Sequence, residues 1–222
     1  MLRGLFISGT GTGVGKTVVA AALMHRYRAT APLRYWKPIQ TGIEQDDDTA
    51  TVRILGDCPD HEIFDQGIRL PRPVSPHLAA RLSEQKIALD PLTAVVADQS
   101  RNLCWIVEGA GGVLVPINDT DKMADLMREL HLPIVITARS ALGTINHTLL
   151  TLEALRSRSL CVAGVVMVGD PHPENSAAIA QFGNVCVLGE IPHFPALNAE
   201  ELGSWSRAHL DPQGKLAEFL HG

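Results

Sequence analysis

The stretch "FISGTGTGVGKTVVAAAL", residues 6 to 23, decides the fold. It places four glycines at alternate positions and follows them with Lys16 and Thr17. The apolar run "GLFISG" before the glycines has strand length, and the alanine-rich "KTVVAAALMHRY" after them carries apolar residues at helical spacing. The glycines therefore lie on a turn that leads from a strand into a helix.

Two phosphate-binding patterns compete for this turn, and their spacing separates them. The dinucleotide pattern G-x-G-x-x-G needs glycine at its sixth position, where this chain has Val14 or Lys16, depending on which glycine starts the pattern. The P-loop pattern G-x-x-x-x-G-K-[ST] finds its second half in Gly15, Lys16 and Thr17, whereas Thr10 stands at its first glycine. The strict pattern is thus missed by one residue, and the strand and helix around it favour the P-loop.

A P-loop turn has a defined chemistry. Its backbone N–H groups converge on phosphate oxygens, helped by the partial positive charge of the helix N-terminus. We expect Lys16 to reach the outer phosphates and the Thr17 hydroxyl to bind Mg²⁺. The residues expected around the phosphates are Gly13, Val14, Gly15, Lys16, Thr17 and Val18.

Composition limits the remaining possibilities. The 222 residues are 45% hydrophobic, which is enough to bury one core, and we expect a single domain over residues 1–222. The net charge is −5 with acids and bases interspersed, which argues against binding nucleic acid or a membrane surface. The short apolar run at the N-terminus and the lack of a long apolar segment predict a cytoplasmic protein.

The cysteines and histidines predict no metal or disulfide framework. The four cysteines lack C-x-x-C spacing and are expected to be buried, reduced thiols; they are Cys58, Cys104, Cys161 and Cys186. The nine histidines lack metal-ligand spacing, so no zinc site is assigned.

Strand-like and helix-like segments alternate along the chain. The strand-like runs are "GLFISG", "LRYWKPI", "CWIVEGAGG", "LPIVITAR", "CVAGVVMVG" and "VCVLGEIP"; the helix-like stretches are residues 17 to 29, 91 to 101, 121 to 130, 144 to 157 and 174 to 182. This alternation predicts an α/β fold with a mostly parallel sheet covered by helices on both faces, and ligands at the carboxyl ends of its strands. The Pro- and Asp-rich residues 57 to 77 are expected to form a long loop.

Several polar residues follow strand ends and point to the same edge. Lys37 and Thr41 stand in "YWKPIQTG", just past a strand-like run. In "QDDDTATV", helix capping explains one or two of the three aspartates and leaves a third free for a metal. Glu108 ends a hydrophobic strand, where acidic residues of P-loop enzymes hold magnesium. Ser75, between two prolines, is expected to cap a helix.

Together these segments resemble the dethiobiotin synthetase family. The similarity covers nearly the whole chain through "GTGTGVGKT", "KPIQTG", "DDTATV", "SPH", "VEGAGGVLVPI", "LGTINHTLLT" and "LGEIP", in the order and spacing typical of that family. Threonine at the first P-loop position is itself a trait of the family. The resemblance implies a P-loop NTPase-type fold, and an ATP-dependent enzyme of the biotin pathway.

The resemblance also implies a reaction and its residues. CO2 carboxylates an amine of diaminopelargonate, the carbamate takes the γ-phosphoryl group of ATP, and the second amine closes a ureido ring. Lys16, Lys37 and Thr12 match catalytic positions, and Thr17, Asp48 and Glu108 match Mg²⁺ ligands. The matched positions for substrate are Thr12, Lys37, Thr41, Ser75, Gly143, Thr144 and Asn146, the last three serving the carboxylate tail of a substrate in the neighbouring subunit of a homodimer; those for nucleotide include Gly109, Ala110, Gly111, Gly169, Asp170, Pro192, His193 and Phe194.

The chain departs from the pattern of the family at three positions. Gly13 replaces a glutamate of some members, and Thr41 replaces a common serine. "MVGD" lacks an asparagine that reads adenine in some members, which leaves other nucleoside triphosphates open as co-substrates.

A P-loop partitioning or scaffolding ATPase is the alternative function. Such ATPases carry a second lysine early in the loop, and Gly11 stands at that position in this chain. A cobalamin-pathway amidotransferase needs a further domain that 222 residues do not hold.

Overall fold

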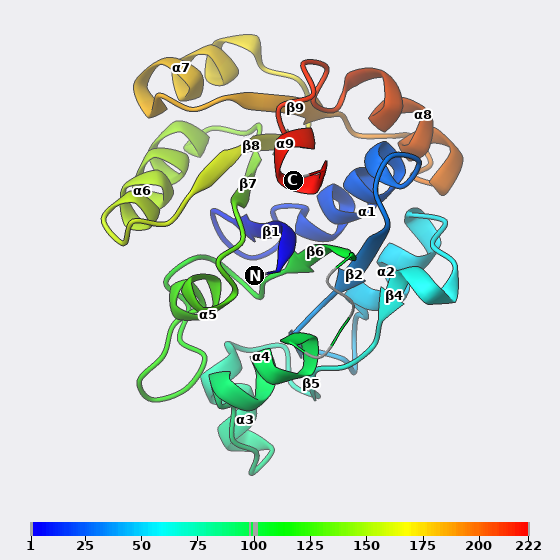
Figure 1. Ribbon diagram of the computed structural model, residues 1–222. Helices are drawn as coiled ribbons and strands as arrows, with labels where there is room; N and C mark the ends of the chain where they lie inside the picture. The colour runs from blue at the N-terminus through cyan, green and yellow to red at the C-terminus, as the bar shows by residue number, and fades with distance from the viewer. Residues whose placement is uncertain (1, 98, 100–101, 222) are drawn as a thin grey trace.

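The computed structural model describes residues 2–97, 99 and 102–221 (Figure 1). In this part of the chain, one sheet has the strand order β4-β2-β6-β1-β7-β8-β9, and a second, two-stranded sheet pairs β3 with β5. The strands are β1 Arg3–Gly9, β2 Leu33–Trp36, β3 Ile39–Thr41, β4 Ile63–Phe64, β5 Ile68–Leu70, β6 Cys104–Glu108, β7 Ile134–Arg139, β8 Val162–Val168 and β9 Val187–Ile191. All pairings between these strands are parallel.

Helices cover both faces of the main sheet, as Figure 1 shows. They are α1 Lys16–Tyr27, α2 Asp48–Leu55, α3 Pro76–Leu82, α4 Leu89–Ala97, α5 Met123–Leu130, α6 Thr144–Arg156, α7 Pro173–Gly183, α8 Ala199–His209 and α9 Ala217–His221. Side chains from α3 to α7 form one core with one face of the sheet, and those from α1, α2, α8 and α9 form a second core with the other. Alternating strand residues supply both cores, as expected of a parallel sheet buried on both faces.

The strand order creates a crevice at the end of β1. This central strand pairs with β6 on one side and with β7 on the other, so the chain changes direction across the sheet at this point. In open α/β sheets such a point, at the carboxyl ends of the strands, is the usual place for a ligand. The turn after β1 and the residues after β2 and β6 meet there.

Pro38 sets the end of β2. The register of β2 on β6 runs as far as Trp36 opposite Val107, and Pro38 cannot continue the ladder because it has no N–H donor. The chain resumes as β3 in the second sheet, so the expected run "LRYWKPI" is divided at Lys37. This break directs Lys37 to the crevice instead of into the sheet.

The structure confirms the expected α/β architecture and corrects it at several places. The five helix-like stretches correspond to α1, α4, α5, α6 and α7, although residues 98, 100 and 101 of the second stretch lie outside the described residues. The long loop expected over residues 57 to 77 is wrong, because this segment contains a 3₁₀ helix at Asp60–Glu62 together with β4 and β5. Helices α8 and α9 were not predicted.

The cysteines are free, as expected, but not all are buried. Cys58 and Cys104 lie in the interior, Cys186 is half-buried and Cys161 is exposed at the turn before β8. The expectation of a buried Cys161 is therefore wrong, because its apolar neighbours belong to the strand and the cysteine precedes it. Across the described residues, no helix combines the length and apolar character needed to span a membrane.

Candidate active site

A cavity of about 680 Å³ opens at the carboxyl ends of β1, β2 and β6. It gathers residues from four separate segments of the sequence, within 12–18, 37–51, 73–76 and 108–115. Of the residues singled out in the sequence, its wall includes Thr12, Gly13, Gly15, Lys16, Thr17, Val18, Lys37, Thr41, Asp48, Ser75, Glu108, Ala110 and Gly111. Val14 and Gly109 are buried next to this wall without lining it.

The P-loop turn has the geometry that its glycines predict. Gly15 is the N-cap of α1 with φ of 96°, a left-handed conformation that favours glycine. A Cβ atom on Gly15 would lie 3.0 Å from Val168 Cγ1, so the residue also permits a close approach to β8. Gly15, Lys16 and Thr17 all line the cavity, so the N-terminus of α1 opens onto it, as a phosphate site requires.

Lys16 lies along this turn. Its ammonium donates a hydrogen bond to the Gly11 carbonyl at 3.0 Å. Burial, and then the nearby Lys37 ammonium, lower the pKa of Lys16 to about 8. An anion bound in the cavity would remove that penalty, because it stabilises the charged form of the amine.

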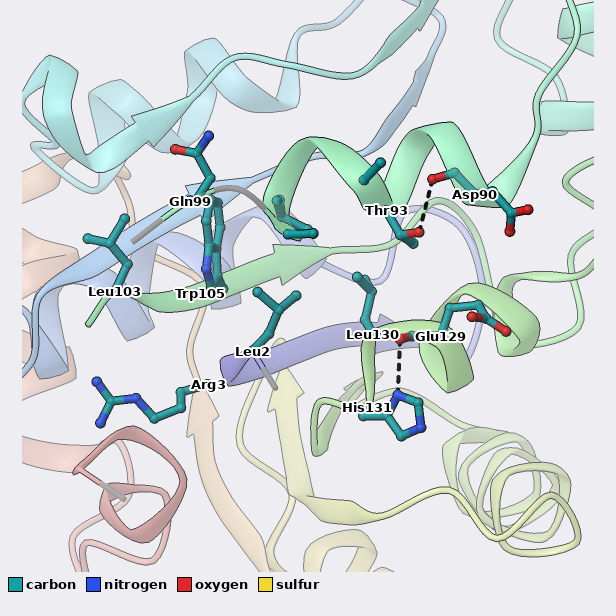
Figure 2. Close-up of a pocket in the computed structure, with 13 residues that line it drawn as sticks. Leu2, Arg3, Asp90, Thr93, Gln99, Leu103, Trp105, Glu129, Leu130 and His131 are labelled. Carbon is teal, nitrogen blue, oxygen red and sulfur yellow. Dashed lines mark hydrogen bonds between the residues drawn. The ribbon is translucent and has the colours of Figure 1, made fainter. Parts of the chain in front are cut away.

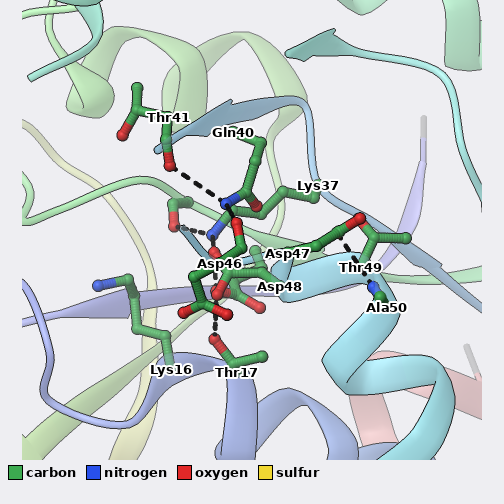
Figure 3. Close-up of polar contacts among 12 residues, drawn as sticks. Lys16, Thr17, Lys37, Gln40, Thr41, Asp46, Asp47, Asp48, Thr49 and Ala50 are labelled. Carbon is green, nitrogen blue, oxygen red and sulfur yellow. Dashed lines mark hydrogen bonds and ion pairs between the residues drawn. The ribbon is translucent and has the colours of Figure 1, made fainter. Parts of the chain in front are cut away.

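A compact group of charges forms the floor of the cavity (Figure 3). The Lys37 ammonium lies 2.6 Å from Asp48 Oδ2 and 2.7 Å from Glu108 Oε1. The Thr17 hydroxyl donates to Asp48 Oδ1 at 2.8 Å and lies 3.1 Å from Glu108 Oε1. Strand ends β2 and β6 and the first residues of α1 and α2 thus bring one cation, two carboxylates and a hydroxyl together.

The charges of this group stabilise one another. Burial alone would lower the pKa of Lys37, but Glu108 and then Asp48 outweigh burial and raise it. Burial would raise the pKa of Asp48, and Lys37 and Thr17 lower it instead. Both groups are therefore charged at neutral pH, and neither charge is left without a partner.

Of the three consecutive aspartates, one caps α2 and another lies at the floor of the cavity, as expected. Asp47 is the N-cap of α2, and its side chain accepts a hydrogen bond from the Ala50 N–H at 3.1 Å. Asp48 follows in the first turn and directs its carboxylate to Thr17 instead. Capping therefore uses one aspartate and leaves Asp48 for the cavity.

Ser75 departs from its expected local role. It is the N-cap residue of α3, but its side chain makes no capping hydrogen bond. Its hydroxyl lies 3.0 Å from His77 Nδ1 at the cavity wall. Capping of α3 by the Ser75 hydroxyl is therefore wrong, and Pro76 at the first helical position accounts for the helix start.

The residues matched to the nucleotide base lie beside the P-loop but outside the 680 Å³ cavity. Gly169 follows β8, and its N–H donates to the Ile191 carbonyl at 2.9 Å, which joins the ends of β8 and β9. Asp170 and His193 are exposed at these ends, and Pro192 and Phe194 are half-buried. The structure thus brings this group together through the backbone, with few side-chain contacts.

Gly143, Thr144 and Asn146 lie at the start of α6 and do not line the cavity either. Gly143 is the N-cap in a left-handed conformation with φ of 92°, and Asn146 is exposed. Thr144 is buried, and its hydroxyl has no hydrogen-bond partner among the described residues. Within one chain, these residues therefore lie outside the cavity that the P-loop lines.

Three residues that line the cavity or contact its lining residues were not predicted from the sequence. Tyr35 donates its hydroxyl proton to Glu108 Oε2 at 2.9 Å. Gln40 is buried in the cavity wall and donates to the carbonyls of Thr41 and Asp46. Arg139, at the end of β7, reaches the Thr12 carbonyl at 3.3 Å. The position of Arg139 at a strand end was a usable signal, whereas Tyr35 and Gln40 depend on pairings that the sequence does not display.

A second cavity, of about 440 Å³, lies at the opposite edge of the sheet (Figure 2). It is bounded by α4, by the end of α5 and by the first residues of β1 and β6, including Arg3, Leu103, Trp105 and Leu130. The amino ends of parallel strands are not where ligands of such sheets bind. The charged groups described above are all at the other edge.

The donor set at the floor of the 680 Å³ cavity fits Mg²⁺. This ion prefers oxygen ligands and is usually held by one or two carboxylates, with phosphates and waters completing its shell. Asp48, Glu108 and Thr17 supply two carboxylates and a hydroxyl. The two carboxylates already hold a cation, the Lys37 ammonium, which shows that their field suits positive charge.

Comparisons with known proteins agree on a family. A family described as an AAA domain matches residues 3–201. The ATP-dependent dethiobiotin synthetase BioD of Paramagnetospirillum magneticum is 48% identical over 198 residues, which cover 89% of this chain and 92% of that protein. The BioD of Agrobacterium fabrum is 44% identical over 214 residues, covering 96% of this chain and 95% of that protein.

Solved structures resemble the chain at the level of fold. A ParA family ATPase from Chlorobium tepidum superposes with a TM-score of 0.55 at 9% identity, covering 92% of this chain and 98% of that one. A putative plasmid partition protein from Borrelia burgdorferi, bound to AMPPNP, gives a TM-score of 0.56 at 12% identity, covering 98% and 97%. At such low identity these neighbours show a shared P-loop NTPase fold alone.

Proposed function

The chain belongs to the family of ATP-dependent dethiobiotin synthetases, ligases of biotin biosynthesis, and from this membership we propose the reaction of its cavity. The substrate is 7,8-diaminopelargonate, which is closed with CO2 to dethiobiotin at the expense of ATP. The observation that carries the proposal is the convergence of Lys16, Lys37 and Thr17 with the buried carboxylate of Glu108 and the half-buried one of Asp48 in one cavity.

The reaction proceeds in three steps. One amine of the substrate attacks CO2, forms a C–N bond and loses a proton, which gives a carbamate. The carbamate oxygen attacks the γ-phosphorus of ATP, so that ADP leaves and a carbamic-phosphoric anhydride forms. The second amine then attacks the carbamoyl carbon, phosphate leaves, and the second C–N bond completes the ureido ring.

The residues of the chain suit these steps because each step develops negative charge on oxygen. Lys16 is placed to neutralise the transferring phosphoryl group, and Lys37 to hold the carbamate once its ammonium leaves the carboxylate pair. The hydroxyls of Thr12 and Thr41 line the substrate side of the same cavity. Phosphoryl transfer needs positioning and charge neutralisation more than a covalent nucleophile, and this set of side chains supplies both.

Thr17, Asp48 and Glu108 are the residues that would hold Mg²⁺. The ion would supply charge neutralisation at the phosphates of the nucleotide. The chain contributes the two carboxylates at the floor of the cavity and the first turn of α1, which presents its N–H groups to the phosphates.

The residues that bind the carboxylate tail of the substrate are proposed to come from a second copy of the chain. Gly143, Thr144 and Asn146 lie outside the cavity of their own chain, next to exposed apolar side chains. Leu142 is fully exposed, and Leu150 on α6 and Phe182 on α7 are 55% and 70% exposed. A two-fold homodimer would cover these side chains and bring the start of α6 to the substrate of its partner.

Phosphate release tests the proposed reaction. We expect release of phosphate from ATP only when diaminopelargonate and bicarbonate are both present, with dethiobiotin formed in equal amount. Release that is independent of the diamine would instead support a partitioning or scaffolding ATPase, the alternative that the sequence left open.

A further inference from the structure

Tyr35 makes one hydrogen bond that ties it to the charged floor of the cavity. The residue lies on β2 with none of its surface exposed, two positions before Lys37. Its hydroxyl donates to Glu108 Oε2 at 2.9 Å, and Glu108 itself is 1% exposed. A tyrosine buried to this degree contributes mainly its packing, unless its hydroxyl has a specific partner.

The two oxygens of Glu108 have different partners. Oε1 faces Lys37 at 2.7 Å and Thr17 at 3.1 Å, on the cavity side. Oε2 faces Tyr35, on the sheet side. The terminal torsion of a glutamate is broad and roughly two-fold, so the carboxylate plane is not fixed by the side chain's own rotamers. The Tyr35 hydroxyl supplies the missing restraint.

The hydrogen bond between Tyr35 and Glu108 has one direction. The Tyr35 O–H donates and Glu108 Oε2 accepts, at 2.9 Å. A phenol has one proton to donate, whereas a carboxylate offers only acceptor oxygens. Because Oε2 is occupied by Tyr35, the carboxylate turns Oε1 to the Lys37 ammonium and the cavity.

We propose that Tyr35 is a positioning residue, which holds Glu108 so that Oε1 faces the cation of the active site. The inference rests on the proposed role of Glu108 as a ligand of Mg²⁺, and it adds a partner behind that ligand. Tyr35 does not line the cavity and acts through Glu108. Hydrogen bonds of this kind behind a metal ligand are commonly worth about 10- to 100-fold in metal affinity.

The chain contains its own control. Tyr27 is the other of its two tyrosines, and it is also buried with its hydroxyl bonded to a buried carboxylate, that of Asp211. That pair joins α1 to the segment before α9 and lies outside the cavity. Tyr27→Phe therefore removes a hydrogen bond of the same type, from a phenol to a carboxylate, without affecting Glu108.

The test compares Mn²⁺ binding by the two variants in the presence of AMPPNP, followed by electron paramagnetic resonance. We expect Tyr35→Phe to weaken Mn²⁺ binding about 10-fold or more and to raise the KM for Mg²⁺ by the same factor. At saturating Mg²⁺ its kcat should stay within about threefold of wild type, because the ligand itself remains. Affinity for AMPPNP in the presence of a chelator should not change. Tyr27→Phe should lower the melting temperature and leave Mn²⁺ binding intact.

Two results would overturn the inference: wild-type Mn²⁺ affinity in Tyr35→Phe, or an equal loss of affinity in both variants, which would indicate general destabilisation. Glu108→Ala separates the inference from the proposal beneath it. If this variant binds Mn²⁺ as wild type does, the metal role of Glu108 is wrong; if it loses the metal while Tyr35→Phe does not, only the role of Tyr35 is wrong.

Discussion

The two ends of the proposed nucleotide site are built in different ways. At the phosphate end, Lys16, Lys37 and Glu108 are 7%, 3% and 1% exposed, and ion pairs connect Lys37 to its carboxylate partners. At the base end, Asp170 and His193 are exposed, and the turns after β8 and β9 are joined by a backbone hydrogen bond.

This difference assigns different tasks to the two ends. A substitution that removes one member of a buried ion pair is strongly destabilising, because the remaining charge is left buried without a counter-charge. Exposed turns that contact a ligand through their backbone tolerate side-chain changes, because the N–H and C=O groups remain. We therefore expect catalysis and stability to depend on the phosphate end, and selectivity at the base end to be weak.

The largest effect is expected from removing a charge at the phosphate end. Lys16→Ala and Glu108→Ala should each lower turnover by about 10²- to 10⁵-fold, because charge neutralisation raises the rate of phosphoryl transfer by factors of this size. His193→Ala at the base end should change turnover by less than about tenfold. Steady-state kinetics measures all three, with circular dichroism as the check on folding. Near-normal turnover of either charge variant, with intact structure, would remove the contrast between the two ends.

Lys37 should matter for stability as well as for turnover. Lys37→Met leaves Asp48 and Glu108 side by side without their cation, and breaking a buried pair in this way costs about 3–5 kcal/mol. Arg53→Met is the matched control, because its partner Asp60 is exposed and such surface pairs are worth about 0–1 kcal/mol. Urea unfolding gives both values.

Added Mg²⁺ sharpens the stability prediction. The ion should raise the melting temperature of Lys37→Met more than that of wild type, because it replaces a lost cation in the variant and competes with Lys37 in wild type. An equal response of the two proteins would show that Lys37 and the metal do not share the same oxygens.

The phosphate end was largely predictable from the sequence. Lys16 and Thr17 follow from a local pattern, and Glu108 from its place at the end of a hydrophobic strand. Asp48 was one of three candidates: Asp47 caps α2, and Asp48 is singled out by its contacts with Thr17 and Lys37. Parallel strands bring their carboxyl ends to one edge, so local patterns were enough to predict this convergence.

The remaining features depend on contacts that no local pattern shows. The bond between Tyr35 and Glu108 crosses from β2 to β6, two strands separated by much of the sequence. β4 and β5 contain only two and three residues, in a Pro- and Asp-rich segment where neighbouring strands, more than propensity, decide the pairing. The role of the start of α6 depends on a second chain, which one sequence cannot display.

Mixed dimers test the proposed contribution of that second chain. Lys16→Ala should inactivate the P-loop of its own chain, and Asn146→Asp should repel the substrate's carboxylate at the partner's site. Random exchange makes half of the dimers mixed, and each mixed dimer has one intact site out of two, so the mixture should recover about a quarter of wild-type activity. Native mass spectrometry verifies the exchange. If exchange occurs without any recovery, the two parts of the site belong to the same chain.

The smallest effect concerns the choice of nucleotide, at the base end. Val168 packs against Gly15, and Gly169 offers only its backbone, so neither supplies the paired donor and acceptor with which an amide side chain reads adenine. An apolar wall separates related ligands by only about 1–3 kcal/mol. We therefore expect GTP and CTP to support the reaction within about a hundredfold of ATP in kcat/KM, measured at saturating diaminopelargonate.

An ATP preference far above a hundredfold would contradict this prediction and would mean that a side chain reads the base. Asn175 on α7 is the first side chain to test. Its Nδ2 donates to the Ser140 carbonyl close to Gly169, which leaves its oxygen free to accept from the adenine amino group. Asn175→Ala would then abolish the preference, whereas a preference that survives this substitution would point to Asp170.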